Sequence, residues 1–313
     1  MAARFSCRSS LDAGGIQKEG HAKHEHGRLR FGEDAITKKI GKYEILSELD
    51  RDVMGTRFRG RDSASGRAVA IKTVDPNFAK NPDFLERFYL EGRAASMVQH
   101  PNIIAVYEVG KDSRTPYIAY ELLEGSDLAQ IVAREEGGKN MLRSSIKLNY
   151  IMQVCRALEY AHQRGMVHRD IRPGAIFVTA DGTVKLTHFS HARLPDNAPT
   201  SSGILIGTVE YMPPESIRGD KVDGRADIWG VGATIYEIFT YTKPFQGGNI
   251  TAMMFAIVSQ EPKGLRELRP DLPVELENIV RRTLKKEPAE RYQTMADLLI
   301  DLEGVHRKIQ EES

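Results

Sequence analysis

The spacing of apolar and polar residues divides the chain into a stranded part and a helical part. Residues 1–40 contain many glycine, lysine, glutamate and histidine residues and few apolar ones, which is typical of a mobile tail. From residue 41 to residue 121 the pattern predicts short β-strands with one helix among them, and from residue 122 to residue 309 helical periodicity dominates. We therefore predict an α+β fold with a small β-rich lobe at 41–121 and a larger helical lobe at 122–309.

Within the β-rich part, residues 68–74 have the composition of a buried strand, and Lys72 lies on its face of small residues. A lysine there needs an anion, because an unpaired buried charge is strongly destabilising. The helix predicted next, which Asn81 can cap, carries Glu91 inside an apolar stripe. We therefore predict an ion pair between Lys72 and Glu91, whose role, structural or functional, stays open here. Gly92 weakens the same helix by roughly 1 kcal/mol relative to alanine.

The composition is that of a globular protein and limits the function only broadly. A formal net charge of +1 gives no global reason to expect binding to nucleic acid or membrane. No apolar run approaches the roughly 18 residues of a membrane span, and the N-terminus lacks the apolar core of a signal peptide. The chain has only two cysteines, Cys7 and Cys155, so we expect a cytoplasmic protein in a reducing environment.

The order of motifs in the second half of the chain carries a resemblance to a known family. His168-Arg169-Asp170 precedes a predicted hairpin at residues 176–186, with Asp181-Gly182 as a two-residue turn, and His188-Phe189-Ser190 follows. This order, with Lys72 before it, resembles the serine/threonine protein kinases, and most of all the bacterial kind. The resemblance covers about residues 40–305 and implies the bilobal kinase-like fold.

The resemblance also implies roles for single residues. Lys72 and Glu91 would position the α- and β-phosphates of ATP, and Asp170 would accept the proton of a substrate hydroxyl or orient that hydroxyl. Asp227 would anchor the catalytic loop, and a buried pair would join Glu215 to Arg291. Because an aspartate at position 170 can also satisfy backbone N–H groups, its presence alone leaves catalysis open.

Contacts with ATP are implied for positions in both lobes: Leu49, Gly55, Ala70, Lys72, Glu121, Leu123 and Phe177. In that arrangement the Glu121 carbonyl and the Leu123 amide would bond adenine at the inter-lobe hinge, and Phe177 would lie beneath the ring. Tyr120 takes the gatekeeper position, where its bulk narrows any pocket behind the adenine.

Two parts of the family's phosphate and metal apparatus are changed in this chain. Its glycine-rich loop keeps only Gly55, and Asp50 and Asp52 bring negative charge to the place of a polyanion, although nearby arginines can offset it. The two metal-holding positions are occupied by Ala175 and His188. Because Mg²⁺ prefers oxygen ligands, we expect no metal site at these positions, while the binding of ATP stays open.

The segment that follows His188 contains Thr200, Ser201 and Ser202. The resemblance implies that this segment is an activation segment, in which phosphate added to these hydroxyls would pair with Arg169. An unmodified polar loop is the alternative interpretation.

These substitutions leave two functions open. The first is a pseudokinase that acts as a signalling scaffold or nucleotide sensor without efficient phosphoryl transfer, with other signalling proteins or kinases as partners. The second is a weak serine/threonine kinase that transfers the γ-phosphate of ATP to protein hydroxyls. The sequence is silent on oligomeric state.

Overall fold

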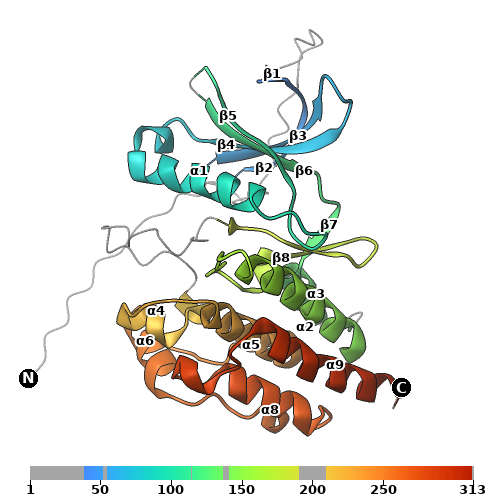
Figure 1. Ribbon diagram of the computed structural model, residues 1–313, viewed down its shortest axis with the longest axis vertical. Helices are drawn as coiled ribbons and strands as arrows, with labels where there is room; N and C mark the ends of the chain where they lie inside the picture. The colour runs from blue at the N-terminus through green and yellow to red at the C-terminus, as the bar shows by residue number, and fades with distance from the viewer. Residues whose placement is uncertain (1–38, 52–54, 114, 137–140, 190–208, 312–313) are drawn as a thin grey trace, which may run out of the picture. The chain divides into compact units, whose positions relative to one another are not determined.

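The computed structural model describes residues 39–51, 55–113, 115–136, 141–189 and 209–311 (Figure 1). The first lobe is a six-stranded antiparallel sheet in the order β1-β2-β3-β4-β6-β5. Its strands are β1 (Lys39–Ile40), β2 (Tyr43–Arg51), β3 (Gly55–Asp62), β4 (Ala68–Val74), β5 (Val106–Asp112) and β6 (Thr115–Glu121). A 3₁₀ turn, η1 (Phe78–Lys80), and one helix, α1 (Pro82–Ser96), connect β4 to β5.

The second lobe is mainly helical and contains a small sheet of three strands. The strands are β7 (Gly125–Asp127), β8 (Ile176–Thr179) and β9 (Val184–Leu186). The helices are α2 (Leu128–Glu136), α3 (Ser144–His162), α4 (Pro214–Arg218), α5 (Arg225–Thr240), α6 (Ile250–Ser259), α7 (Leu265–Leu268), α8 (Val274–Thr283) and α9 (Met295–Glu311). Short 3₁₀ turns are η2 (Pro173–Ala175), η4 (Val209–Tyr211) and η5 (Pro288–Glu290). The predicted α+β fold with a β-rich and a helical lobe is confirmed.

One predicted boundary and one predicted turn differ from the structure. The predicted tail reaches residue 40, but Lys39 and Ile40 form β1, which pairs antiparallel with β2 and buries Ile40. The predicted two-residue turn is wrong, because residues 180–183 connect β8 to β9 and the Asp181 carboxylate accepts the Thr183 N–H at 3.2 Å. The rest of the predicted tail lies outside the described residues.

Helix α1 packs against the sheet beside β5 (Figure 1). Asn81 caps it as predicted, since its side chain accepts the N–H groups of Asp83 and Phe84. Gly92 faces the sheet so closely that an added Cβ would lie 2.5 Å from Val109 Cγ2 and 3.0 Å from Ile118 Cδ1. The glycine therefore has a packing role, which the helix-propensity argument alone does not capture.

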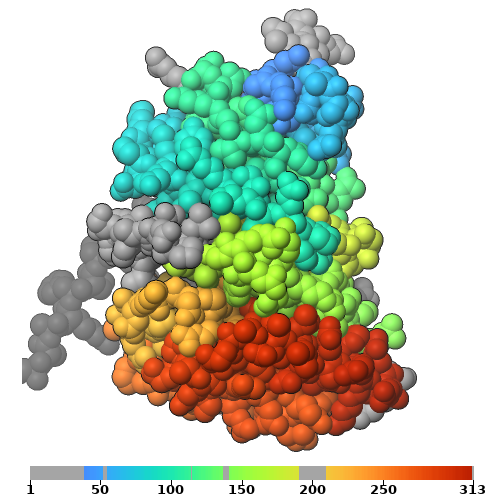
Figure 2. All heavy atoms as spheres, in the orientation of Figure 1, coloured from blue at the N-terminus to red at the C-terminus, as the bar shows by residue number. Residues whose placement is uncertain are grey.

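The core of the helical lobe surrounds α5, which is buried at nearly every position. A helix that is apolar on all sides belongs in the interior, and Trp229 stacks there on Phe245 with ring centroids 5.6 Å apart. In the space-filling view the green residues lie between the cyan residues of the first lobe and the orange and red helices (Figure 2). No helix among the described residues is long and apolar enough to cross a membrane.

Backbone hydrogen bonds join the loop after α1 to β9 of the helical lobe. The Ile104 N–H donates to the Leu186 carbonyl at 2.9 Å, and the Leu186 N–H donates to the Asn102 carbonyl at 2.8 Å. The Asn102 side chain also donates to the Val184 carbonyl at 2.9 Å. These bonds fix the C-terminal end of α1 relative to β9, the strand that leads to the candidate site.

Candidate functional site

The predicted ion pair between Lys72 and Glu91 is present. Lys72 Nζ lies 2.8 Å from Glu91 Oε2 and 3.1 Å from Oε1, and the Glu91 side chain is only 10% exposed. Burial alone would raise the pKa of Glu91, but attraction to Lys72 and its hydrogen bonds hold that pKa below its usual value. Glu91 is therefore a carboxylate at neutral pH, and its two bonds hold the Lys72 ammonium in place.

A second donor reaches the same carboxylate. The Tyr120 hydroxyl donates a hydrogen bond to Glu91 Oε1 at 3.2 Å, and Tyr120 is 7% exposed. Burial and the neighbouring Glu91 charge raise the pKa of Tyr120 well above its usual value, so the hydroxyl stays protonated. The sequence predicted only the bulk of Tyr120 and missed this bond.

The catalytic-loop motif is anchored by a buried aspartate, as predicted. The Asp227 carboxylate on α5 accepts the backbone N–H groups of His168 at 2.9 Å and Arg169 at 2.7 Å. It also bonds His162 Nε2 at 2.7 Å. Burial would raise the pKa of Asp227, but the bond and charge of His162 hold it below its usual value. The His168 ring also packs on Phe189, with centroids 4.7 Å apart, which links the loop to the following motif.

The candidate catalytic aspartate is paired with an arginine. Arg172 Nε lies 3.2 Å from Asp170 Oδ1 and 3.4 Å from Oδ2. Their side chains are 25% and 9% exposed, respectively, so the pair is more strongly coupled than one in open water. The guanidinium places a fixed positive charge beside Asp170, which is suited to orient a hydroxyl or neutralise a phosphate oxygen.

Neither of the two metal-ligand positions carries an oxygen donor on its side chain. Ala175 is fully buried and contributes only a methyl group, while its carbonyl accepts the backbone N–H and the hydroxyl of Thr187. His188 Nδ1 lies 2.8 Å from Thr187 Oγ1, and its backbone is left-handed at φ 64°. Within the described part of the chain, no cluster of three or more histidine, cysteine or acidic side chains is arranged to hold a metal ion.

The charges of both ion pairs, Lys72–Glu91 and Arg172–Asp170, act on the His188 imidazole. Burial lowers its pKa to about 4, and the positive charges of Lys72 and Arg172 act in the same direction. The carboxylates of Glu91 and Asp170 oppose this effect without reversing it. The imidazole is therefore neutral at neutral pH and offers nitrogen where an acidic ligand would offer charged oxygen.

The residues of the altered phosphate loop have structural partners. Arg57 on β3 pairs with Asp50 on β2, with Nε 2.7 Å from Oδ1, so the positive charge offsets this acid. A Cβ on Gly55 would lie 1.9 Å from the Thr73 carbonyl oxygen, so pairing of β3 with β4 requires glycine there. The survival of Gly55 is therefore explained without any phosphate. Asp52 lies outside the described residues.

Comparison with known proteins decides the family. The model of the protein kinase domain matches residues 43–300. The chain belongs to the protein kinase family. A probable serine/threonine-protein kinase of Streptomyces coelicolor is 34% identical over 271 residues, which are 84% of this chain and 40% of that protein. The serine/threonine-protein kinase PknB of Mycobacterium tuberculosis is 34% identical over 272 residues, which are 85% of this chain and 43% of PknB.

Solved structures agree with this assignment. The kinase domain of PknI from Mycobacterium tuberculosis has a TM-score of 0.67 and 27% identity, and the match covers 86% of this chain and 98% of that one. The chain spans about 40% of the length of the curated relatives it matches. The protein kinase family uses ATP and normally Mg²⁺.

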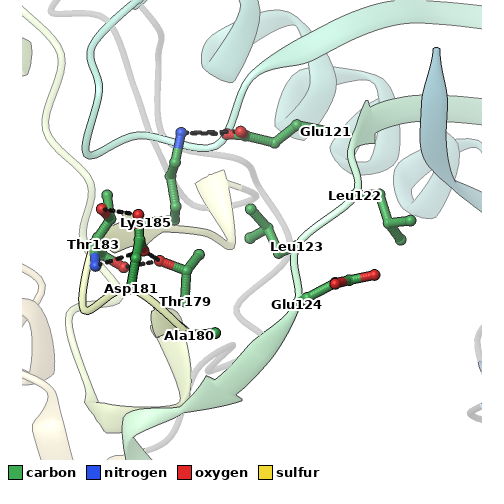
Figure 3. A pocket seen from close by; sticks show the side chains of 9 residues that line it. All are labelled: Glu121, Leu122, Leu123, Glu124, Thr179, Ala180, Asp181, Thr183 and Lys185. Carbon is green, nitrogen blue, oxygen red and sulfur yellow. Dashed lines mark hydrogen bonds and ion pairs between the residues drawn. The ribbon is translucent and has the colours of Figure 1, made fainter.

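The kinase hinge lies between β6 and β7 and borders a hollow of about 430 Å³ (Figure 3). Residues 121–124 line one side, and residues 179–181, Thr183 and Lys185 of the β8–β9 hairpin line the other. Of the predicted ATP contacts, this hollow includes Glu121 and Leu123, and Lys185 Nζ bonds the Glu121 carboxylate at 2.8 Å. The predicted adenine bonds to the Glu121 carbonyl and the Leu123 amide stay predictions.

The other predicted kinase positions lie on separate elements. Leu49, on β2, is 47% exposed. Ala70 on β4 stands opposite Tyr120 in the register of the sheet, and Phe177 lies on β8. The candidate phosphorylation sites Thr200, Ser201 and Ser202 lie outside the described residues.

The second structural pair of the kinase fold forms as predicted. Arg291 donates to both oxygens of Glu215 at 2.7 Å, and both side chains are buried. The guanidinium also bonds the backbone carbonyls of Arg225, Lys285 and Lys286. This pair holds α4 and the start of α5 to the segment before η5.

Proposed function

We propose that this kinase domain is a pseudokinase, a module that binds partner proteins and nucleotide without efficient phosphoryl transfer. The observation that carries the proposal is the pair of side chains at the metal positions, a buried methyl group at Ala175 and a neutral imidazole at His188. Kinase catalysis depends on metal ions to bridge the β- and γ-phosphates and to neutralise developing charge. These two residues do not fit Mg²⁺, which prefers oxygen ligands in near-octahedral geometry.

The remaining charged groups support nucleotide binding of a weaker kind. Lys72 keeps the position from which an ammonium reaches phosphate oxygens, and Arg172 adds a second cation near Asp170. A nucleotide bound by these two cations alone would rely on hydrogen bonds and charge from the protein. Its affinity is then expected to be indifferent to added Mg²⁺.

The proposed partners are other signalling proteins or kinases, and the proposed location is the cytoplasm. The net charge of +1 supports neither a nucleic-acid nor a membrane partner. The groups that support a kinase-like shape, such as the Asp227 anchor and the Glu215–Arg291 pair, are intact. A module with this shape offers partners a kinase-like surface.

The second candidate is an active but weak serine/threonine kinase, and the Lys72–Glu91 pair is the observation that favours it. Asp170 stands beside Arg172, where it could accept a proton from a hydroxyl or orient that hydroxyl. The relatives named above are serine/threonine-protein kinases by name. On this hypothesis the residual activity would rest on Lys72, Glu91 and Asp170.

Thermal unfolding with ATP, in the presence of either Mg²⁺ or EDTA, separates the two. For a pseudokinase we expect ATP to raise Tm equally in both conditions. A ligand at 100 times its Kd stabilises a protein by ~2.7 kcal/mol, which corresponds to several degrees at this size. Phosphorylation of protein that requires Mg²⁺ and disappears in Asp170→Asn would overturn the proposal.

A matched set of variants tests the metal positions directly. His188→Asp with Ala175→Asn restores oxygen ligands, so we expect ATP to raise Tm more with Mg²⁺ than with EDTA. His188→Asn with Ala175→Asn is the control, because it lacks the charged carboxylate. An unmodified chain that already shows a Mg²⁺-dependent shift would contradict the expected role of Ala175 and His188.

A further inference from the structure

The Glu91 carboxylate receives hydrogen bonds from two neighbouring strands. Lys72 donates from β4 at 2.8 Å and 3.1 Å, and Tyr120 donates from β6 at 3.2 Å. In the register of these strands Ala70 stands opposite Tyr120 and Lys72 stands opposite Ile118. Opposite residues share a face, and residues two apart on one strand share it too. Both donors therefore project toward α1 from the same face of the sheet.

The depth at which α1 packs brings Glu91 within reach of the hydroxyl. Gly92 follows Glu91, and its missing side chain lets the helix approach Val109 and Ile118. Glu91 and Tyr120 are both buried, with 8% and 7% of the whole-residue surface exposed. Water cannot easily replace a bond in such a place, so losing one partner leaves a buried charge less well solvated.

The neighbouring residue fixes the end of the same strand. Successive side chains on a strand point to opposite faces, and Glu121 points away from α1. Its carboxylate accepts the Ala105 N–H at 2.7 Å. It also accepts two bonds from Lys185 Nζ, at 2.8 Å and 2.9 Å (Figure 3). The last two residues of β6 before the hinge are therefore attached on one face to α1 and on the other to β9.

We infer that Tyr120 is a positioning residue, whose hydroxyl holds Glu91 and α1 in the arrangement that pairs with Lys72, without a bound nucleotide. Glu121 supports this by fixing the strand that carries Tyr120. The assembled position of α1 is then a property of the chain itself. The inference does not depend on the proposed function, because it concerns the protein free of ligand.

Hydrogen exchange, followed by mass spectrometry on the full chain without nucleotide, tests the inference. In Tyr120→Phe we expect peptides from residues 82–96 to exchange on the order of tenfold faster, because a charge-assisted hydrogen bond is lost. Peptides from α5 should exchange at the rate of the unmodified chain. Equal exchange of residues 82–96 in Tyr120→Phe and the unmodified chain would overturn the inference.

Tyr117→Phe is the matched control, since it removes a hydroxyl from the same strand. The Tyr117 hydroxyl donates to Glu108 at 2.8 Å, not to Glu91. We expect this variant to leave the exchange of residues 82–96 unchanged. An acceleration equal to that of Tyr120→Phe would show a general loosening of the sheet and would count against a specific role of Tyr120.

A second background distinguishes positioning of Glu91 from a merely structural role of the ring. In Glu91→Gln the amide oxygen accepts a weaker bond than a carboxylate does. Adding Tyr120→Phe to this background should therefore accelerate the exchange of residues 82–96 by a smaller factor than in the unmodified chain. An equal factor in both backgrounds would mean that the hydroxyl acts through another group, which overturns the inference.

Discussion

At the scale of single residues, a histidine in the candidate site stands within the influence of two ion pairs. His188 has the left-handed backbone that non-glycine residues rarely adopt, and only asparagine, aspartate and histidine are clearly enriched there. An aspartate could therefore occupy this position without new backbone strain. At position 188 the difference from a metal-binding kinase thus concerns the side chain alone, and the backbone there needs no change.

The pKa of His188, lowered to about 4 chiefly by burial, gives a pH dependence that one substitution can isolate. Between its usual pKa of 6.5 and about 4, the unfolded chain binds a proton that the folded chain does not. Stability contributed by this group is therefore lost as the pH falls below 6.5. We expect His188→Asn to lose roughly 1.5 kcal/mol less than the unmodified chain between about pH 6.5 and pH 5.

Urea unfolding at a series of pH values measures this difference. The comparison concerns the slope of the free energy of unfolding with pH, so a constant effect of the substitution on stability does not matter. Equal slopes of the free energy of unfolding with pH in His188→Asn and in the unmodified chain would show that folding does not lower the pKa of His188.

At the scale of elements, the packing of α1 on the sheet determines where Glu91 lies in the site. Gly92→Ala should stabilise an isolated helix by up to about 1 kcal/mol. In this protein the new Cβ would meet Val109 and Ile118, so we expect a net destabilisation of about 1–3 kcal/mol from overpacking. Urea unfolding followed by far-ultraviolet circular dichroism measures the change.

Gly304 on α9 is the matched control for this substitution, because an added Cβ there meets no atom within 4 Å. Gly304→Ala should therefore stabilise the protein by up to about 1 kcal/mol. If both substitutions stabilised the protein alike, α1 would have to be packed less closely than described.

The sequence predicted the elements of the site better than the contacts between them. The two-residue period of β4 and the apolar stripe of α1 were sufficient to predict the Lys72–Glu91 pair, since both are local patterns. The Tyr120–Glu91 bond depends on the register of β4 with β6 and on the depth of α1, and neither is encoded locally. The sequence missed the packing role of Gly55 for the same reason, because its close neighbour Thr73 lies on another strand.

At the scale of the whole molecule, the helical lobe depends on a buried ion pair that joins distant segments. Removing one partner of such a pair leaves an uncompensated charge in the interior. We expect Arg291→Met to destabilise the helical lobe by about 3–5 kcal/mol, because Glu215 and three backbone carbonyls lose their donor. Trp229, the single tryptophan, is buried in α5, so its fluorescence during urea unfolding reports on this lobe.

Arg156→Met provides the comparison for the loss of an arginine at the surface. Arg156 pairs with Glu303 at 2.9 Å, and both side chains are more than 40% exposed. Exposed pairs contribute less than about 1 kcal/mol, so this variant should unfold close to the unmodified chain. A similar loss in Arg156→Met and Arg291→Met would mean that burial does not distinguish the two pairs.

The bond between Tyr120 and Glu91 also bears on the design of small-molecule inhibitors. A compound that extends behind the gatekeeper must displace the Tyr120 ring and leave the Glu91 carboxylate with one donor fewer. Part of its binding energy would be used to break that buried bond, which is worth roughly 1.5–3 kcal/mol for a charged acceptor. Compounds confined to the hinge side of Tyr120 avoid this loss, so chemical probes of this protein should be sought among the shorter scaffolds.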